Sequence, residues 1–382
     1  MENIVRPGLE GVVAATTRLS SVDGEAGELI IAGFPLEELA LKSSFEETVY
    51  LLWNDALPNA TQLAEFRAAL TARRTLHPVV YALLREAAAQ KVDPMDALRM
   101  AASAGTLQRE GATGGKSDAY NDALSMVAKF PTIVATYWRL RGGKEPVEPR
   151  ADLGHAANYL YMLFGAEPSA SQVRGLETYL NTVSDHGLNA STFTARVIMS
   201  TQSDVISAVV GAIGALKGPL HGGAPGPALD MVFEIGRVEN AEPWLKTKLA
   251  KGDRLMGFGH RVYKVRDPRA AVLSAAAEIM FKSGGGDMAL YNLAREIETI
   301  AVRVLEEHKP GRKLQTNVEY YTALLLHGLG LSTDVFTPTF AVGRVGGWTA
   351  HCFEQQKETR IFRPQSLYSG VKTRTWVPVE KR

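Results

Sequence analysis

The chain has 382 residues, of which 46% are hydrophobic and 22% are charged, and its formal net charge is +1. These values are ordinary for a globular protein, and the length favours two lobes over a single core. The balanced charge argues against binding to nucleic acid or to a membrane surface, because both usually require an excess of basic residues.

The first segment, residues 9–33, predicts a β-hairpin. Val12–Val13 and Leu29–Ile31 are β-forming residues, and they flank Asp23, Gly24 and Gly27, which are typical of turns. We therefore expect a strand, a turn and a second strand near the start of the chain.

Helical periodicity dominates after this hairpin. Ser44 and Glu47 form the pattern of a capping box, and Ser203–Asp204 precedes the apolar run 205–216, whose small residues suit close packing in the core or at a subunit interface. Helices are expected near residues 48–53, 61–72, 78–90, 94–108, 118–142, 152–164, 170–184, 190–200, 205–216, 227–236, 241–250, 268–283, 288–308, 317–330 and 340–356. The tail from residue 363 shows no period and is expected to be extended. The sequence thus predicts a mainly α protein with one small β element.

Three of the eight histidines lie in breaks between the expected helices: His186, His221 and His260. His221 lies within Gly-Pro-Leu-His-Gly-Gly and His260 within Gly-Phe-Gly-His-Arg-Val-Tyr-Lys, and such glycines let the backbone approach a ligand closely. Either ring alone could be an ordinary turn residue with a hydrogen bond. Two imidazoles in the two most glycine-rich turns indicate a functional site instead. These histidines are separated by 35 and 39 residues, which does not fit the close-spaced ligands of a zinc site, so no metal is expected.

Arginines and one acid form a second group. Arg269 ends the sequence Arg-Asp-Pro-Arg, Arg344 lies between glycines in an apolar segment, and Arg363 precedes a proline. The arginine fork suits bidentate binding of carboxylates, although each residue could also lie on a solvated surface. Glu319 opens an apolar helix, where a carboxylate can simply complement the helix dipole.

Together these residues suit one kind of chemistry. An acidic base and two neutral imidazoles can remove a proton from a weakly acidic C–H bond and stabilise the resulting enol or enolate, while arginines hold an anionic electrophile. The sequence contains neither a phosphate-binding P-loop pattern nor a dinucleotide-binding glycine pattern. Nucleotide hydrolysis and hydride transfer are therefore not expected.

Four longer motifs carry more information than these single residues. They are SDHGLNASTF at 184–193, KGPLHGGA at 217–224, GFGHRVYK at 257–264 followed by Asp267-Pro-Arg269, and FTPTF at 336–340 followed by Gly343-Arg344. In this order, and together with the Asp23–Gly24 turn, they resemble the citrate synthase family over about residues 8–370. The length of the chain is similar to that of the short dimeric bacterial and archaeal members.

The resemblance implies a citrate-synthase-like two-domain helical fold with a small N-terminal β-hairpin. The large helical domain would comprise residues 1–221 and 326–382, and the small helical domain would comprise residues 222–325. The active site would lie in the cleft between them, and closure would exclude water until condensation is complete.

The resemblance also assigns roles. His221 would hydrogen-bond the thioester carbonyl, His260 would polarise and protonate the keto oxygen of oxaloacetate, and Glu319 would be the catalytic base. The carboxylates of oxaloacetate would be bound by His186, Arg269 and Arg344, with Arg363 reaching the site from the partner subunit of a homodimer. CoA would contact Arg254, Leu255, Gly257, Gly259, Lys264, Arg312 and Lys313.

One position departs from the family pattern. The base is usually the aspartate of an Asn-Val-Asp motif, whereas this chain has Asn317-Val-Glu319. Glutamate keeps the acid–base chemistry but is one methylene longer, and displacing a catalytic group by about 1 Å can cost on the order of 100-fold in rate. Either the backbone is shifted to accommodate the longer side chain or the enzyme is slow with acetyl-CoA. Because a minority of bacterial members carry glutamate here, a working enzyme is expected.

The first functional hypothesis is a citrate synthase, which converts acetyl-CoA, oxaloacetate and water to citrate and CoA. It would need no cofactor, since acetyl-CoA is a co-substrate. The alternatives are a 2-methylcitrate synthase, because one extra methyl group is worth only about 1–3 kcal/mol of discrimination, and a non-catalytic paralogue that binds a dicarboxylate or CoA. A cytoplasmic location is expected, because Cys352 is the only cysteine, no signal-peptide pattern is present, and the longest apolar run is too short to span a bilayer.

Overall fold

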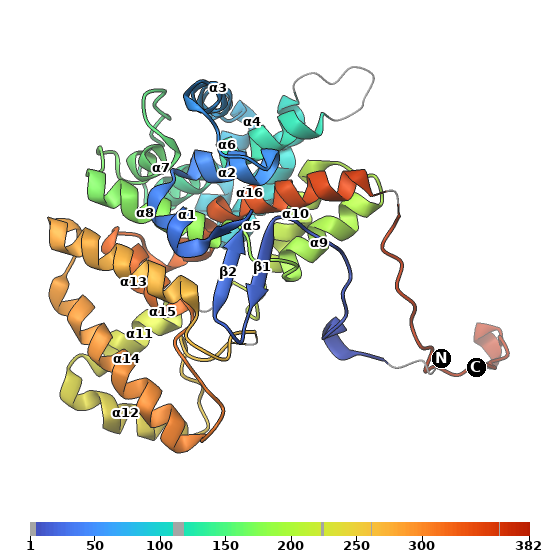
Figure 1. Cartoon of the computed structure of the whole chain (residues 1–382). Helices are drawn as coiled ribbons and strands as arrows, with labels where there is room; N and C mark the ends of the chain where they lie inside the picture. The colour runs from blue at the N-terminus through green and yellow to red at the C-terminus, as the bar shows by residue number, and fades with distance from the viewer. Residues whose placement is uncertain (1–4, 110–117, 223–224, 261, 359) are drawn as a thin grey trace.

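The computed structural model describes residues 5–109, 118–222, 225–260, 262–358 and 360–382, and it confirms the mainly α fold (Figure 1). A small antiparallel sheet has the strand order β1 (Ser20–Asp23), β2 (Glu28–Ile31) and β3 (Phe34–Pro35). The Asp23 carboxylate accepts hydrogen bonds from the backbone N–H groups of Glu25 at 3.0 Å and Ala26 at 2.9 Å, which closes the predicted turn.

The predicted position of the first strand was wrong. Val12–Val13 lie outside the sheet, and Val13 is 89% exposed. The turn after Asp23 pairs Glu28–Ile31 with the four residues that directly precede the turn, so that Ser20 lies opposite Ile31. Residues 12 and 13 precede Ser20, the first residue of β1, by several positions, and they therefore do not pair with β2.

Helices α1–α10 and the long helix α16 form the larger body of the molecule (Figure 1). Within it, α16 packs against α2, α5, α6, α8, α9 and α10 and is therefore the centre of the core. The bounds are α1 Leu36–Lys42, α2 Phe45–Asn54, α3 Ala60–Thr71, α4 Pro78–Ala89, α5 Pro94–Ser103, α6 Ala119–Arg141, α7 His155–Phe164, α8 Ala170–Val183, α9 Ala190–Ser200, α10 Val205–Leu216 and α16 Phe336–Lys357.

Helices α11–α15 gather beside this body, at the lower left of Figure 1. There α12 packs on α14, and both α11 and α13 pack on α15, while α13 also contacts α1 and α8 of the larger body. The bounds are α11 Pro225–Ile235, α12 Val238–Ala250, α13 Pro268–Met280, α14 Met288–His308 and α15 Val318–Gly328.

The helix starts confirm several sequence signals. The Ser44 backbone N–H donates to the Glu47 carboxylate at 2.8 Å while the Ser44 hydroxyl accepts from the Glu47 N–H, which completes the capping box. Asp204 accepts from the Ser207 N–H at 2.7 Å and caps α10, which is largely buried. The last long helix begins at Phe336 rather than near residue 340. Its Pro338 is tolerated because the first N–H groups of a helix have no partner within the helix.

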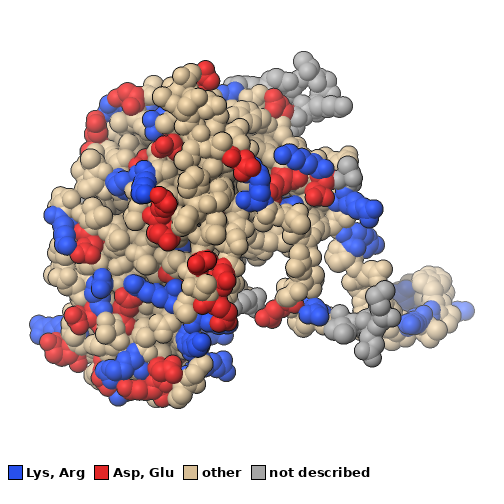
Figure 2. Space-filling model, viewed as in Figure 1, with Lys and Arg blue, Asp and Glu red and all other residues tan. Residues whose placement is uncertain are grey.

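The surface carries mixed charges and an extended arm. Acidic and basic side chains are interspersed over the face shown in Figure 2. The tail from residue 363 is largely extended, as predicted, and it runs away from the body (Figure 1). Leu367 and Trp376 in this arm are 65% and 76% exposed. Across the described ranges, no helix is both long and apolar enough to cross a membrane.

Candidate active site

The three histidines singled out in the sequence lie at breaks between helices. His186 follows α8, His221 follows α10, and His260 lies between α12 and α13. The ring centroids of His186 and His260 are 6.0 Å apart. The guanidinium of Arg344 lies 4.7 Å from the ring of Phe340, whose other neighbour at 6.3 Å is the ring of His221. Residues far apart in the sequence are thus brought together at one site.

The His260 ring has a defined tautomer. Its Nδ1 atom accepts hydrogen bonds from the backbone N–H groups of Val262 at 3.0 Å and Tyr263 at 3.1 Å, so the proton of the neutral ring is on Nε2. A guanidinium nitrogen of Arg269 lies 3.3 Å from Nε2. This edge of the His260 ring therefore lies beside the cationic guanidinium. Burial and the charge of Arg269 lower the pKa of His260 to about 4, which keeps the ring neutral at pH 7.

Arg269 is fixed by a buried ion pair with Asp267. Its Nε and one terminal nitrogen donate to the Asp267 carboxylate at 3.0 and 2.8 Å, and the two side chains are 6% and 0% exposed. Asp267 also accepts a hydrogen bond from the backbone N–H of Val318 at 3.2 Å. The ion pair therefore ties the start of α13 to the start of α15, where Glu319 lies.

The glycine-rich loop before His260 pairs with the segment before Glu319. The Gly259 N–H donates to the Gln315 carbonyl at 2.7 Å, and the Asn317 N–H donates to the Gly257 carbonyl at 2.9 Å. Gly257 and Gly259 have φ angles of 87° and 80°, which side chains other than glycine rarely adopt. This backbone pairing joins the segment that carries His260 to the segment that leads to Glu319.

Glu319 has the electrostatic properties of a base that works near neutral pH. Its backbone N–H donates to the Asn317 side chain at 3.0 Å, which fixes the first turn of α15. Burial raises the pKa of the Glu319 carboxyl to about 7, against the opposing charge of Arg269 and with a contribution from Asp267. A carboxylate with such a pKa can both take up and release a proton under physiological conditions.

His221 is oriented by Ser191, which the sequence analysis did not single out. The Ser191 hydroxyl oxygen lies 2.8 Å from His221 Nε2 and 2.8 Å from Asn189 Oδ1, and it accepts a hydrogen bond from Trp348 Nε1 at 3.0 Å. The backbone N–H of Ser191 also donates to His221 Nε2 at 3.4 Å. These contacts hold the ring of His221 by its Nε2 edge. Burial and the charge of Arg344 lower the pKa of His221 to about 4.

Arg344 and His186 complete the polar lining. Arg344 is 1% exposed, and its Nε donates to the Val183 carbonyl. Burial lowers the pKa of Arg344 to about 10, so the side chain remains charged at pH 7. His186 Nε2 lies 3.1 Å from the Tyr263 hydroxyl, and burial together with the charges of Arg269 and Arg344 holds its pKa well below the usual range. The site thus offers two cationic groups and neutral rings to an anion.

Arg363 is the predicted site residue that the structure does not bring to this group within one chain. It lies on the exposed arm after α16, and its guanidinium donates to the Pro364 carbonyl at 3.3 Å. The described residues also include no cluster of three or more His, Cys, Asp or Glu side chains that could hold a metal ion.

The residues predicted to contact CoA lie around the loop before His260. Leu255 and Gly257 are buried in it, while the Arg254, Lys264, Arg312 and Lys313 residues are exposed. Arg312 and Lys313 precede the segment that pairs with this loop, so they lie near the other predicted CoA contacts.

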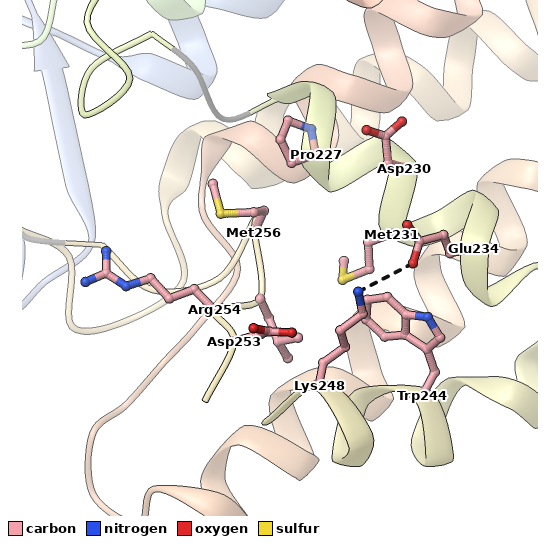
Figure 3. A pocket seen from close by; sticks show the side chains of 10 residues that line it. Pro227, Asp230, Met231, Glu234, Trp244, Lys248, Asp253, Arg254 and Met256 are labelled. Carbon is pink, nitrogen blue, oxygen red and sulfur yellow. Dashed lines mark ion pairs between the residues drawn. The ribbon is translucent and has the colours of Figure 1, made fainter. Parts of the chain in front are cut away.

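A cavity of about 350 Å³ lies between α11, α12 and residues 253–256 (Figure 3). Lys248 pairs with Glu234 at 3.7 Å across its wall, and the Arg254 side chain points away from Asp230 and Glu234 in the figure. The wall thus carries three carboxylates and two cationic side chains. Its lining comprises Pro227, Asp230, Met231, Glu234, Trp244, Lys248, Asp253, Arg254, Leu255 and Met256.

Sequence reasoning overlooked the residues that orient the reactive groups: Ser191, Tyr263 and Asp267. All three lie within or beside the motifs quoted above, so their presence was visible. Their contacts could not be predicted from the sequence, because Ser191 and Tyr263 contact histidine rings that lie 30 and 77 positions away.

Comparison with known proteins places this site in a family. The sequence model of the family described as citrate synthase, C-terminal domain, matches residues 8–365. Citrate synthase 2 of Bacillus subtilis is 43% identical over 376 residues, which cover 98% of each chain. A 2-methylcitrate synthase of Mycobacterium tuberculosis is 38% identical over 96% of this chain and 91% of its own.

A solved structure supports the same assignment. It is the citrate synthase of the archaeon Thermoplasma acidophilum in a ternary complex with carboxymethyl coenzyme A and oxaloacetate. It has a TM-score of 0.89 and 28% identity, with 99% of this chain and 100% of that chain covered. The chain therefore belongs to the citrate synthase family.

Proposed function

We propose that this enzyme condenses acetyl-CoA with oxaloacetate and water to give citrate and CoA. The observation that carries the proposal is the grouping of a carboxyl with a pKa of about 7, two neutral imidazoles and two buried arginines. These are the groups that enolisation of a thioester and capture of a dicarboxylic keto acid require.

The first step is removal of a methyl proton from acetyl-CoA. Glu319 takes this proton, and the electron pair of the C–H bond moves toward the thioester carbonyl. His221 donates a ring N–H to the carbonyl oxygen and stabilises the enol or enolate. A neutral donor fits this role, because its ring is held neutral by burial and by the nearby Arg344.

The second step forms the carbon–carbon bond. The enol carbon attacks the keto carbon of oxaloacetate, and the keto oxygen takes a proton from His260 Nε2. A proton equivalent to the one that Glu319 removed then returns to the His260 ring, so that both groups are restored. Arg269, Arg344 and His186 bind the two carboxylates and orient the keto group. Water then hydrolyses the thioester of the condensed product and releases citrate and CoA. The phosphates of CoA bind at Arg254, Lys264, Arg312 and Lys313, while Leu255, Gly257 and Gly259 contact its adenine end.

The experiment that tests this function is CoA release by the purified protein with oxaloacetate, compared between acetyl-CoA and propionyl-CoA. We expect kcat/KM to favour acetyl-CoA by about 10-fold or more, the value of one methyl group in a fitted pocket. A preference for propionyl-CoA would make 2-methylcitrate the product, as the similarity to the mycobacterial enzyme allows. No CoA release with either thioester would contradict catalysis and favour a binding role.

We also propose the division into a large domain (1–221 and 326–382) and a small domain (222–325). The grouping of α11–α15 in Figure 1 supports it. The packing of α13 on α1 and α8 marks the surface along which the domains would move. In this arrangement His260, Arg269, Glu319 and the predicted CoA contacts belong to the small domain. His186, His221, Arg344 and Arg363 belong to the large one, so domain closure completes the site.

A homodimer in which Arg363 reaches the partner's site follows from the same proposal. The exposed arm that carries Arg363 supports it, because the arm extends away from its own body. The single cysteine, Cys352, is a buried free thiol, which is compatible with the proposed cytoplasmic location.

Co-expression of two inactive variants tests the dimer. Arg363→Ala and Glu319→Gln each remove one group from every site. In a mixed dimer, however, one site combines an intact Glu319 with an intact Arg363 from the partner. We expect random pairing to restore about a quarter of the wild-type sites, measured as CoA release. If Arg363 acted within its own chain, no site in the mixture would be intact and activity would stay at the level of the single variants.

A further inference from the structure

One face of α16 contacts three consecutive residues of the segment that leads to His186. Arg344 Nε donates to the Val183 carbonyl. At Gly347, one turn later, an added Cβ would lie only 2.1 Å from the Ser184 carbonyl oxygen. After a further turn, His351 Nε2 lies 3.0 Å from Asp185 Oδ1. The spacing of these positions places them on the same helix face.

Asp185 is an anchor directly beside His186 in the chain. Besides His351, its carboxylate accepts a hydrogen bond from the Ser20 hydroxyl at 2.5 Å, and the Ser20 oxygen accepts from the Gly187 N–H at 2.7 Å. The residues before and after His186 are therefore both held. Burial alone would raise the pKa of Asp185, but His351, Arg344 and Ser20 lower it below the usual range. The carboxylate is thus ionised, and His351 donates its Nε2–H.

The other edge of the His351 ring is also held. Its Nδ1 lies 3.5 Å from a guanidinium nitrogen of Arg196 and 3.6 Å from the Glu354 carboxylate. Arg196 is 1% exposed and donates to the Gln355 side chain at 2.9 Å and to the Thr16 carbonyl at 3.1 Å. His351 itself is completely buried. The ring is a fixed part of the helix framework and does not contact the proposed substrate.

We propose that His351 is a positioning residue for the dicarboxylate site. Through Asp185 it fixes residues 184–187 and thereby the distance from His186 to Arg344 and Arg269. A dicarboxylate needs its donors at a set spacing, and a shift of about 1 Å in such a group can cost on the order of 100-fold. This inference rests on the proposed function, in which His186 binds a carboxylate of oxaloacetate.

Two replacements of His351 separate the hydrogen bond from the packing. In His351→Gln the side-chain amide nitrogen can replace Nε2 as the donor to Asp185, whereas His351→Leu has similar bulk but no donor. For His351→Leu we expect the Kd and KM for oxaloacetate to rise about 10- to 100-fold, with the KM for acetyl-CoA unchanged. His351→Gln should stay close to wild type. Equal values for the leucine variant and wild type, or equal losses in both variants, would overturn the proposal.

Cys352→Ala is the matched control, because Cys352 is the next residue on α16 and is completely buried. It should lower Tm without changing the Kd for oxaloacetate. If it changed that Kd as much as His351→Leu does, general loosening of α16 would explain both results and the proposal would fail.

Hydrogen exchange of the ligand-free protein separates this inference from the proposed function. The Gly187 N–H and its neighbours should lose protection in His351→Leu and keep it in His351→Gln. Unchanged protection in the leucine variant would overturn the positioning role whatever the substrate is. Absence of CoA release by the wild-type protein would instead contradict the proposed function.

Discussion

Glu319→Gln is expected to lower kcat for CoA release by about 10²- to 10⁴-fold, the contribution typical of a positioned general base. Binding of oxaloacetate, measured by calorimetry, should be largely retained, because Arg269, Arg344 and His186 are unchanged. Loss of that binding as well would show that Glu319 has a structural role. Glu319→Asp, which has the shorter side chain usual in the family, is the matched control and should retain more activity than the glutamine variant.

The raised pKa of Glu319 makes the same assignment testable by pH. Since the base must be ionised, kcat/KM for acetyl-CoA should fall as the pH drops below about 7 and should reach a plateau above it. The same ionisation has the opposite effect on the stability of the fold. A carboxyl whose folded pKa is raised destabilises the fold as the pH rises from its ordinary pKa of 4.5 through about 7. Glu319→Gln should therefore have a higher Tm than wild type at pH 8 and a similar Tm at pH 4. Identical Tm values at pH 8 would contradict a buried Glu319 carboxyl with a raised pKa.

Arg269→Gln is expected to have the second large effect, on both folding and binding. It leaves the Asp267 carboxylate, which is 0% exposed, without its ion-pair partner. Breaking a buried pair in this way typically costs about 3–5 kcal/mol of unfolding free energy. The same change removes a donor to the proposed oxaloacetate site. Urea unfolding and calorimetry with oxaloacetate measure the two effects separately.

The double variant Asp267→Asn, Arg269→Gln distinguishes these two roles. It removes both charges, so it should recover much of the lost stability but none of the oxaloacetate binding. As a control, Arg303→Gln breaks an exposed ion pair with Glu242 and should leave the unfolding free energy nearly unchanged. Recovery of binding in the double variant would show that Arg269 acts only through the fold.

The sequence by itself determined the elements and the kinds of reactive group. Helix bounds such as 190–200 and 205–216 were predicted correctly, because periodicity and N-caps act over a few neighbouring residues. The glycine-rich turns around His221 and His260 and the motifs that show the family are local features as well. The first strand was placed wrongly, because several segments of similar β propensity precede the turn and only the ladder selects one.

Only the tertiary structure decided the protonation and the pKa values of these groups. The proton on His260 is assigned to Nε2 by two backbone N–H groups, and the ring of His221 is oriented by Ser191, 30 positions away. The pKa of Glu319 near 7 follows from burial, which no window of sequence contains. The contact between His351 and Asp185 joins residues 166 positions apart. Hydrogen-bond direction, desolvation and charge–charge distance are properties of packed neighbours in space, and for this reason they emerge only from the fold.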